Sequence, residues 1–153
     1  MKIFVDAMGG DFAPQAPVEG AIEALRRYPE IEVVLAGVIP EIEKYLVNCD
    51  DVRSRIELLD APEVITNEES PVMGVRRKVT SATVKGMLAL RDKEVDGFVS
   101  AGSTGAVLAG GMFRLGRIPG VERPALAPLM PNGKSHFLLI DCGANVDCKP
   151  EYL

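Results

Sequence analysis

The chain has 153 residues, which suits one domain or one lobe of a larger protein. Hydrophobic residues make up 47% of it and charged residues 25%, which excludes a disordered chain, and the formal net charge of −5 argues against a broad nucleic-acid-binding surface. No stretch approaches the roughly 20 apolar residues that a membrane-spanning helix needs. Three cysteines without the paired spacing of a zinc site or a disulfide framework indicate a reducing, cytoplasmic compartment.

Short apolar runs alternate with segments of helical periodicity along the first half of the chain. The apolar runs at residues 2–5, 31–36 and 56–59 predict strands. Apolar residues at helical spacing predict a helix that begins near Pro14 or Pro17 and ends before Pro29. A second helix is expected over residues 40–47.

The same alternation continues in the second half. Helices are expected over residues 71–78, 82–90 and 104–115, strands over 95–99 and 137–140, and an extended segment over 125–129. Gly110 and Gly111 suit a helix pressed closely against a neighbour, because an interior glycine otherwise costs about 1 kcal/mol relative to alanine. Strands alternating with helices predict a three-layer α/β domain or lobe over residues 1–153, with a mostly parallel sheet and helices on both faces. Since the chain stops at Leu153, inside an expected helix, we expect it to be the N-terminal part of a longer enzyme.

Polar loops follow three of the expected strands, at residues 6–11, 100–106 and 141–147. Ligands of open parallel sheets bind at the carboxyl ends of strands, so we expect these loops to converge. The middle loop passes through Ala-Gly-Ser-Thr-Gly directly into a helix. Its glycines allow close backbone approach, and the helix start offers unpaired N–H groups, which favours a phosphate or another anion. The alternative is that Ser103 or Thr104 merely caps the helix.

The other polar residues admit a structural and a functional interpretation. Asp6 or Asp11 could orient a donor or hold a metal, although no sequence pattern fixes a metal, or Asp11 could cap the following helix. The basic run 76–78 could be a solvated face or could balance the charge of a phosphate. Asn145 and Asp147 could bind a substrate or shape a tight turn, and Cys142 and Cys148 are expected to be small core residues.

Several strings of residues together resemble the PlsX family of phosphate acyltransferases. The resemblance extends over the whole of this chain and corresponds to about the first half of such a protein. The strings are Met-Lys-Ile-Phe-Val-Asp-Ala-Met-Gly-Gly-Asp at 1–11, and the segments 61–65, 70–71, 100–106, 116–126 and 143–148. The resemblance implies transfer of a fatty acyl group from acyl carrier protein to inorganic phosphate. The acyl phosphate product would then feed a membrane acyltransferase in phospholipid synthesis.

The resemblance also implies a homodimer that is cytoplasmic and associates with the membrane surface, with no nucleic acid as partner. The implied fold is similar to that of phosphotransacetylase and of the isocitrate and isopropylmalate dehydrogenases. The chemistry requires no metal or organic cofactor. Two alternatives stay open at this point: a non-catalytic lobe that binds phosphate or the carrier protein, and a nicotinamide-dependent dehydrogenase of similar fold.

The residue patterns and the resemblance together give thirteen candidate site residues. Bound phosphate would attack the thioester carbonyl directly, while Cys142 or Cys148 as an acyl-enzyme nucleophile is a second route. The phosphate-binding candidates are Gly102, Ser103, Thr104 and Gly105. The catalytic candidates are Arg76 or Lys78, which would balance the phosphate charge, and Asn145, which would stabilise an oxyanion. The substrate-binding candidates are Asp6, Gly9, Gly10, Asp11, Asp141 and Asp147. The chain departs from the family pattern at Ser103, where asparagine is common, and at Phe12, where histidine is frequent.

Overall fold

The computed structural model describes residues 1–121 and 124–142. Its contacts divide the chain into two compact units, Met1–Leu115 and Gly116–Leu153, and each is described here by itself. The single domain or lobe expected from the sequence stays a prediction.

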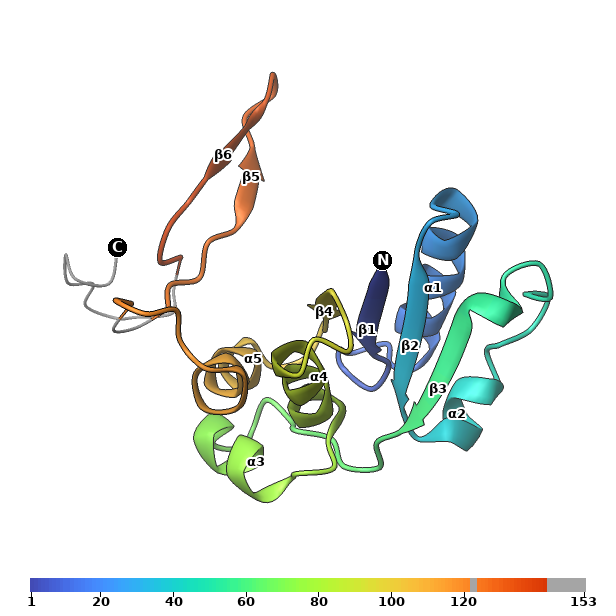
Figure 1. The fold of residues 1–153 in the computed structure, drawn as a ribbon, viewed down its shortest axis with the longest axis horizontal. Coiled ribbons are helices and arrows are strands. Elements are labelled where there is room, and N and C mark those ends of the chain that lie inside the picture. Colours follow the sequence, from blue (N-terminus) through green and yellow to red (C-terminus); the bar gives the residue numbers. More distant parts are fainter. Residues whose placement is uncertain (122–123, 143–153) are drawn as a thin grey trace. The chain divides into compact units, whose positions relative to one another are not determined.

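The first unit is built on a parallel sheet of the strands β1 (Lys2–Asp6), β2 (Glu32–Gly37), β3 (Ile56–Asp60) and β4 (Gly97–Val99). The strand order is β3-β2-β1-β4, and every pairing within this sheet is parallel (Figure 1). All four strands lie where the apolar runs predict them. The order makes β1 and β4 direct neighbours, although they are far apart in the sequence.

Both faces of this sheet are covered by helices, as the alternation of elements predicts (Figure 1). Helices α1 (Gln15–Arg27) and α2 (Ile39–Glu43) pack on one face together with Val33 and Leu35 of β2. Helix α4 (Ala82–Arg91) packs on the other face. Alternate residues of a strand point to opposite faces, so the uninterrupted apolar run of β2 reflects burial on both sides.

Two further helices extend the layer that contains α4. They are α3 (Pro71–Arg77) and α5 (Thr104–Gly110), and α5 continues into a π-helical segment, Gly111–Leu115. A Cβ atom added to Gly110 would lie 3.1 Å from Cγ of Met87 on α4, so the close approach expected of this helix holds there; at Gly111 a Cβ atom would meet nothing within 4 Å. Within the described residues, none of the helices is long and apolar enough to cross a membrane.

The second unit contains the strands β5 (Leu129–Pro131) and β6 (His136–Leu138), which pair antiparallel. The sequence predicts a strand at 137–140 in the parallel sheet, and the pairing seen for β6 differs from that expectation. The reason lies in the connection: Oδ1 of Asn132 accepts hydrogen bonds from the backbone N–H groups of Lys134 and Ser135, and Gly133 has φ 85°. Asn-Gly between two apolar runs is a signal for a hairpin.

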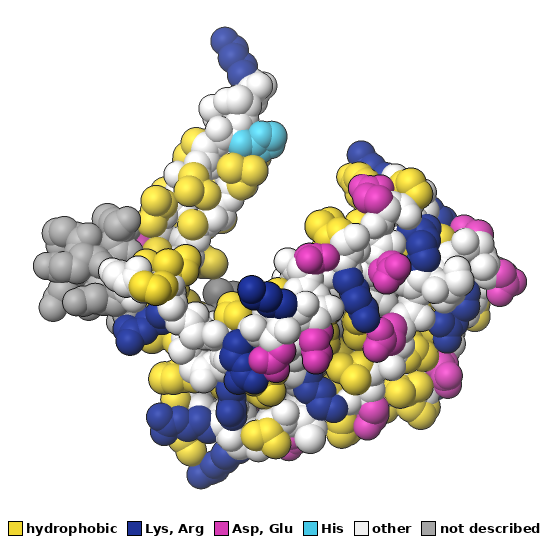
Figure 2. Space-filling view, in the orientation of Figure 1, with side chains coloured by type: hydrophobic (Ala, Val, Ile, Leu, Met, Phe, Trp, Pro, Cys, Tyr) yellow, Lys and Arg dark blue, Asp and Glu magenta, His cyan; other side chains and the backbone are white. Residues whose placement is uncertain are grey.

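Charged side chains on the visible face of the first unit are of both signs (Figure 2). Basic side chains gather over α3, where Arg76 and Arg77 are exposed. Acidic and basic side chains are interspersed over the rest of this face. The visible face therefore carries charges of both signs.

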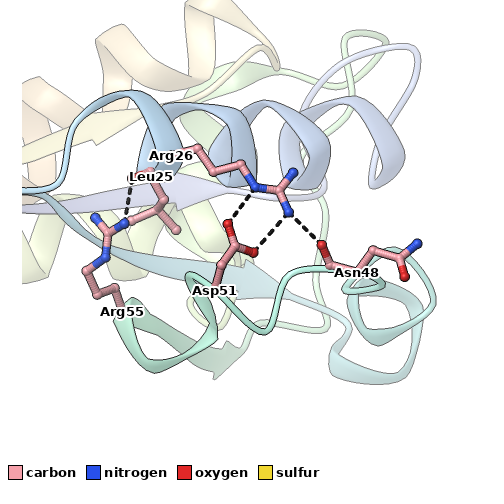
Figure 3. A network of polar contacts seen from close by, with 5 residues as sticks. All are labelled: Leu25, Arg26, Asn48, Asp51 and Arg55. Carbon is pink, nitrogen blue, oxygen red and sulfur yellow. Dashed lines mark hydrogen bonds and ion pairs between the residues drawn. The ribbon is translucent and has the colours of Figure 1, made fainter.

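The C-terminal end of α1 is held by arginines from the segment before β3 and from α1 itself (Figure 3). Arg55 donates hydrogen bonds to the carbonyl oxygens of Leu25, Tyr28 and Ile31. The last carbonyls of a helix have no partner within the helix, and a positive charge there also complements the helix dipole. Arg26 makes a two-pronged contact with Asp51, but both of these side chains are about half exposed.

We expect Arg55→Met to lower the free energy of unfolding of the 153-residue chain by about 1.5–3 kcal/mol, because several charged hydrogen bonds are lost at once. Urea denaturation at neutral pH measures the change. Arg91→Met is the matched control, since Arg91 is paired only with the adjacent, equally exposed Asp92 and should contribute little. Equal losses in the two variants would contradict a special role for Arg55.

Candidate functional site

The loops that follow β1 and β4 meet at the carboxyl edge of the parallel sheet, as expected for adjacent strands. A Cβ atom added to Gly9 would lie 2.8 Å from the backbone nitrogen of Gly102 and 2.8 Å from Oγ of Ser100. The next residue, Gly10, has φ 101° and lies against Ala101. Both positions therefore require glycine, Gly9 for close approach and Gly10 for its left-handed backbone.

A buried carboxylate joins the two loops. Asp6 is only 6% exposed, and its Oδ2 accepts a hydrogen bond of 2.8 Å from the hydroxyl of Ser100. Its Oδ1 accepts a bond of 3.0 Å from the backbone N–H of Met8. The same Ser100 oxygen accepts a bond of 3.1 Å from the N–H of Gly102. One hydroxyl thus connects the end of β1 to the chain that leads into α5.

Burial raises the pKa of Asp6 above the ordinary aspartate value of 3.8. Hydrogen bonds from Ser100, from the Met8 and Gly9 backbone and from Thr83 of α4 act in the opposite direction, because they stabilise the ionised form. Four donors around one buried carboxylate are what burial of a charge requires. Asp6 holds the hydroxyl of Ser100, and its role in substrate binding stays a prediction.

The start of α5 supplies backbone donors at the same edge. Oγ of Ser103 accepts a bond of 3.4 Å from the N–H of Ala106, so Ser103 caps the helix. The N–H of Gly102 is engaged by Ser100. Within the described part of the chain, no hydrogen bond is made by the N–H groups of Ser103, Thr104 and Gly105. The capping interpretation is therefore correct for Ser103, and it leaves these three groups available to an anion.

Helix α3 flanks this loop through its first residue. A Cβ atom added to Gly105 would lie 2.7 Å from Cγ of Pro71, so the two helix starts touch and Gly105 has no room for a side chain. Lys78, at the end of α3, donates to the carbonyl oxygen of Val64 at 2.6 Å and forms an ion pair with Glu69. This contact is the main cause that lowers the pKa of the Glu69 carboxyl.

The two basic candidates on this helix are thus placed differently. The charge of Lys78 is balanced within the protein by Glu69. The guanidinium of Arg76 lies 5.7 Å from the centroid of the Phe113 ring and is exposed. Of the two, Arg76 is the side chain that keeps its charge toward solvent.

The remaining candidates are Asp11 in the first loop, Asp141 in the second unit and two residues outside the described range. Asp11 is exposed and does not cap α1, whose N-cap residue is Pro14. That alternative is wrong because the helix begins only at Gln15, which is beyond the reach of an N-cap at Asp11. Asp141 belongs to the second unit and has φ 58°. Asn145 and Asp147 lie outside the described residues.

The expectation that Cys142 and Cys148 are core residues is wrong for Cys142 and cannot be compared with the structure for Cys148. Cys142 is exposed rather than a core residue, because it follows the exposed strand β6 instead of entering the sheet of the first unit. Cys148 lies outside the described residues. Cys49, by contrast, is buried.

Thr83 and Pro71 are not among the site residues predicted from the sequence, and Ser100 is predicted only as part of the loop 100–106, without a role of its own. Ser100 had a signal, since it is the first polar residue after the β4 strand, at the position where a side chain can reach the neighbouring strand end. Thr83 and Pro71 had none that a single sequence reveals, because their contacts depend on how α3 and α4 pack.

The fold is shared with phosphotransacetylases. A phosphotransacetylase from Streptococcus pyogenes superposes with a TM-score of 0.66 at 16% identity, covering 97% of this chain and 48% of that one. EutD phosphotransacetylase from Staphylococcus aureus superposes with a TM-score of 0.61 at 20% identity, over the same shares of the two chains. At these identities the likeness defines the class of fold, a three-layer α/β structure, as the sequence predicts.

The chain belongs to the family described as fatty acid synthesis protein, which matches residues 1–153. It is 50% identical over its whole length to a phosphate acyltransferase from Alkaliphilus oremlandii and 48% identical to one from Clostridium novyi. It covers 45% and 46% of those two proteins, so the chain spans about half the length of the curated relatives it matches. The resemblance stated from the sequence motifs is thereby confirmed at the level of the family.

Titration of Asp6 should make its contribution to stability fall as pH rises. Its folded pKa lies above the ordinary 3.8, so the favourable contribution is complete below that value and is lost as pH rises through the raised pKa. We therefore expect the difference in unfolding free energy between the natural chain and Asp6→Asn to shrink from about pH 3 toward neutrality in urea titrations.

Asp51→Asn is the control, because the contribution of Asp51 to the unfolding free energy should depend on pH in the opposite direction. The hydrogen bond from Arg26 lowers the pKa of Asp51, so its contribution is present at neutral pH and lost as pH falls. If the difference in unfolding free energy between the natural chain and Asp6→Asn is constant, or grows as pH rises, then burial is not the dominant influence on the pKa of Asp6.

Proposed function

We propose that this chain forms the phosphate-binding part of an enzyme that transfers a fatty acyl group from acyl carrier protein to inorganic phosphate. The observation that carries the proposal is the group of three N–H donors at residues 103–105, held by the Asp6–Ser100 contact at the edge of the sheet. Membership of the fatty acid synthesis family, and relatives named phosphate acyltransferase, support phosphate as the anion. They also favour acyl transfer over the dehydrogenase alternative.

The reaction needs one nucleophile and one leaving group. An oxygen of hydrogen phosphate attacks the carbonyl carbon of the thioester and the carbon–sulfur bond breaks. The leaving sulfur takes up the proton that the hydrogen phosphate loses, which gives acyl phosphate and a free thiol. The N–H groups of Ser103, Thr104 and Gly105, with the Thr104 hydroxyl, would hold the phosphate in place. A preorganised donor of this kind lowers a reaction barrier by roughly 2.7–4 kcal/mol when it faces developing charge. Asp6 acts behind these groups, as a positioning residue.

The other assignments belong to the same proposal. Arg76 would balance the phosphate charge, since Lys78 is already paired with Glu69. Asn145 would stabilise the oxyanion, and Asp141, Asp147 and Asp11 would contact substrate. The full-length enzyme would be a cytoplasmic homodimer that works at the membrane surface and passes acyl phosphate to a membrane acyltransferase. No metal or organic cofactor enters the reaction.

The test is acyl phosphate formation from acyl-[acyl carrier protein] and radiolabelled inorganic phosphate, with a full-length protein that contains these residues assayed beside the 153-residue chain. We expect the full-length protein to form acyl phosphate and the shorter chain to bind phosphate without turnover. Phosphate-independent thioester cleavage, or turnover that requires a nicotinamide cofactor, would contradict the proposal. Turnover by the 153-residue chain would contradict the need for the remaining length.

Substitution at Thr104 tests the phosphate contact itself. We expect Thr104→Val in the full-length protein to raise the KM for phosphate by roughly tenfold, because one hydrogen bond to a charged ligand is lost. The KM for the acyl thioester should change little. Thr104→Ser, which keeps the hydroxyl, should restore the phosphate KM. An unchanged KM for phosphate in Thr104→Val would show that the Thr104 hydroxyl does not contact phosphate.

A further inference from the structure

Lys78, at the end of α3, reaches back to the segment that precedes the same helix. Its Nζ donates hydrogen bonds to the carbonyl oxygen of Val64 at 2.6 Å and to Oε1 of Glu69 at 2.5 Å. The same Glu69 oxygen accepts the backbone N–H of Thr66 at 2.7 Å. One ammonium group therefore ties together the segment 64–69, and it does so from the far end of the helix that this segment leads into.

The contact between Lys78 and Glu69 is partly shielded from solvent. Their side chains are 30% and 29% exposed, whereas those of Lys2 and Glu57, which form an ion pair elsewhere in the unit, are 36% and 56% exposed. Partly buried ion pairs are screened less than exposed ones, and this pair is reinforced by two backbone partners. The contact can therefore hold the segment in one place.

The segment also packs directly against α3. Ile65 is 8% exposed and belongs to a core cluster with Val75 of α3 and Ala106 of α5. A Cβ atom added to Gly74 of α3 would lie 2.7 Å from Cγ2 of Ile65, so no space separates the helix from the segment. A displacement of the segment would therefore displace α3 with it, because a close-packed interior transmits such movements.

The first residue of α3 lies against the candidate phosphate loop. The position of a Cβ atom on Gly105 is 2.7 Å from Cγ of Pro71, and the N–H of Gly105 is one of the three donors available to an anion. Pro71 and Lys78 are separated by about 10 Å along α3, at 1.5 Å per residue. The helix thus connects the Lys78 contact to the loop although Lys78 is at its other end.

We propose that Lys78 is a positioning residue for the phosphate site. Through Glu69 and the segment 64–69 it holds α3 in place, so that Pro71 keeps the backbone of Gly105 in the orientation that binds phosphate. This assignment rests on the proposed function and gives Lys78 a role other than balancing the phosphate charge.

The two roles of Lys78 predict opposite effects of a substitution at Glu69. If Lys78 balanced the phosphate charge, Glu69→Gln would release its ammonium group and remove a negative charge, so phosphate would bind more tightly. If Lys78 is a positioning residue, Glu69→Gln weakens phosphate binding, because the segment is held less firmly, even though the chain has become less negative.

The experiment measures the Kd for inorganic phosphate from the amide shifts of the ¹⁵N-labelled 153-residue chain. Lys78→Met and Glu69→Gln should each raise the Kd by roughly threefold to tenfold. The double variant should bind no more weakly than Lys78→Met, since both changes act through one contact. Lys78→Arg, which can donate to both oxygens, should restore most of the affinity.

Lys2→Met is the matched control, because it removes the same charge and breaks the ion pair with Glu57 at the start of β1. It should leave the phosphate Kd unchanged. In spectra without phosphate, the Gly105 amide should move in Lys78→Met and in Glu69→Gln but not in Lys2→Met. Tighter phosphate binding by Glu69→Gln overturns the proposal. So does a Lys78→Met chain that is less stable to urea but keeps the natural Gly105 shift and phosphate Kd.

The two kinds of spectra separate this inference from the proposed function. If the natural chain binds phosphate and the Lys78 and Lys2 variants bind it equally well, only the positioning role is overturned. If the natural chain does not bind phosphate, the proposed function is overturned, and the phosphate-free Gly105 shift still decides whether Lys78 controls the loop. Should Lys78→Met fail to fold, Glu69→Gln and Lys78→Arg give the same decision, because both keep the size and polarity of the original contact.

Discussion

The hydrogen bond between Ser100 and the buried carboxylate of Asp6 is the contact on which the candidate site depends. It joins residues 94 positions apart, which become neighbours only because β4 pairs with β1. The carboxylate can stay buried because several donors surround it, and Ser100 is the donor that comes from the other strand end. By accepting the N–H of Gly102, the same hydroxyl fixes the backbone just before α5. The donors of the loop are therefore oriented before any ligand arrives, which is the condition for electrostatic preorganisation.

Close backbone packing adds a second constraint on the same loop. Gly9 approaches it from β1, and Pro71 of α3 approaches it from the other side at Gly105. In both places a Cβ atom would fall below 3 Å from its neighbour, so the shape of the loop is set by contacts that leave no room for adjustment.

Much of this architecture can be predicted from the sequence, because it follows from local patterns. The apolar run of β2 indicates burial on both faces, and alternation with helices indicates a parallel sheet. The loops after β1 and β4 could be expected to meet at one edge. The partners of Ser100 and Lys78, which are Asp6 and Glu69, could not be predicted, since they are set by strand order and by the packing of α3. The apolar pattern also cannot predict the antiparallel direction of β6, because parallel and antiparallel strands can share the same pattern. The Asn132-Gly133 turn is the sequence feature that indicates it.

The most direct measurement is a titration of the ¹⁵N-labelled chain with inorganic phosphate, followed by the chemical shifts of its backbone amides. The account predicts the largest shifts at Ser103, Thr104 and Gly105, whose N–H groups make no hydrogen bond within the described residues. The amide of Gly102 should move much less, because Ser100 already accepts its hydrogen. Shifts centred on Gly102, or on the exposed arginines of α3 with none in the loop, would contradict the central claim.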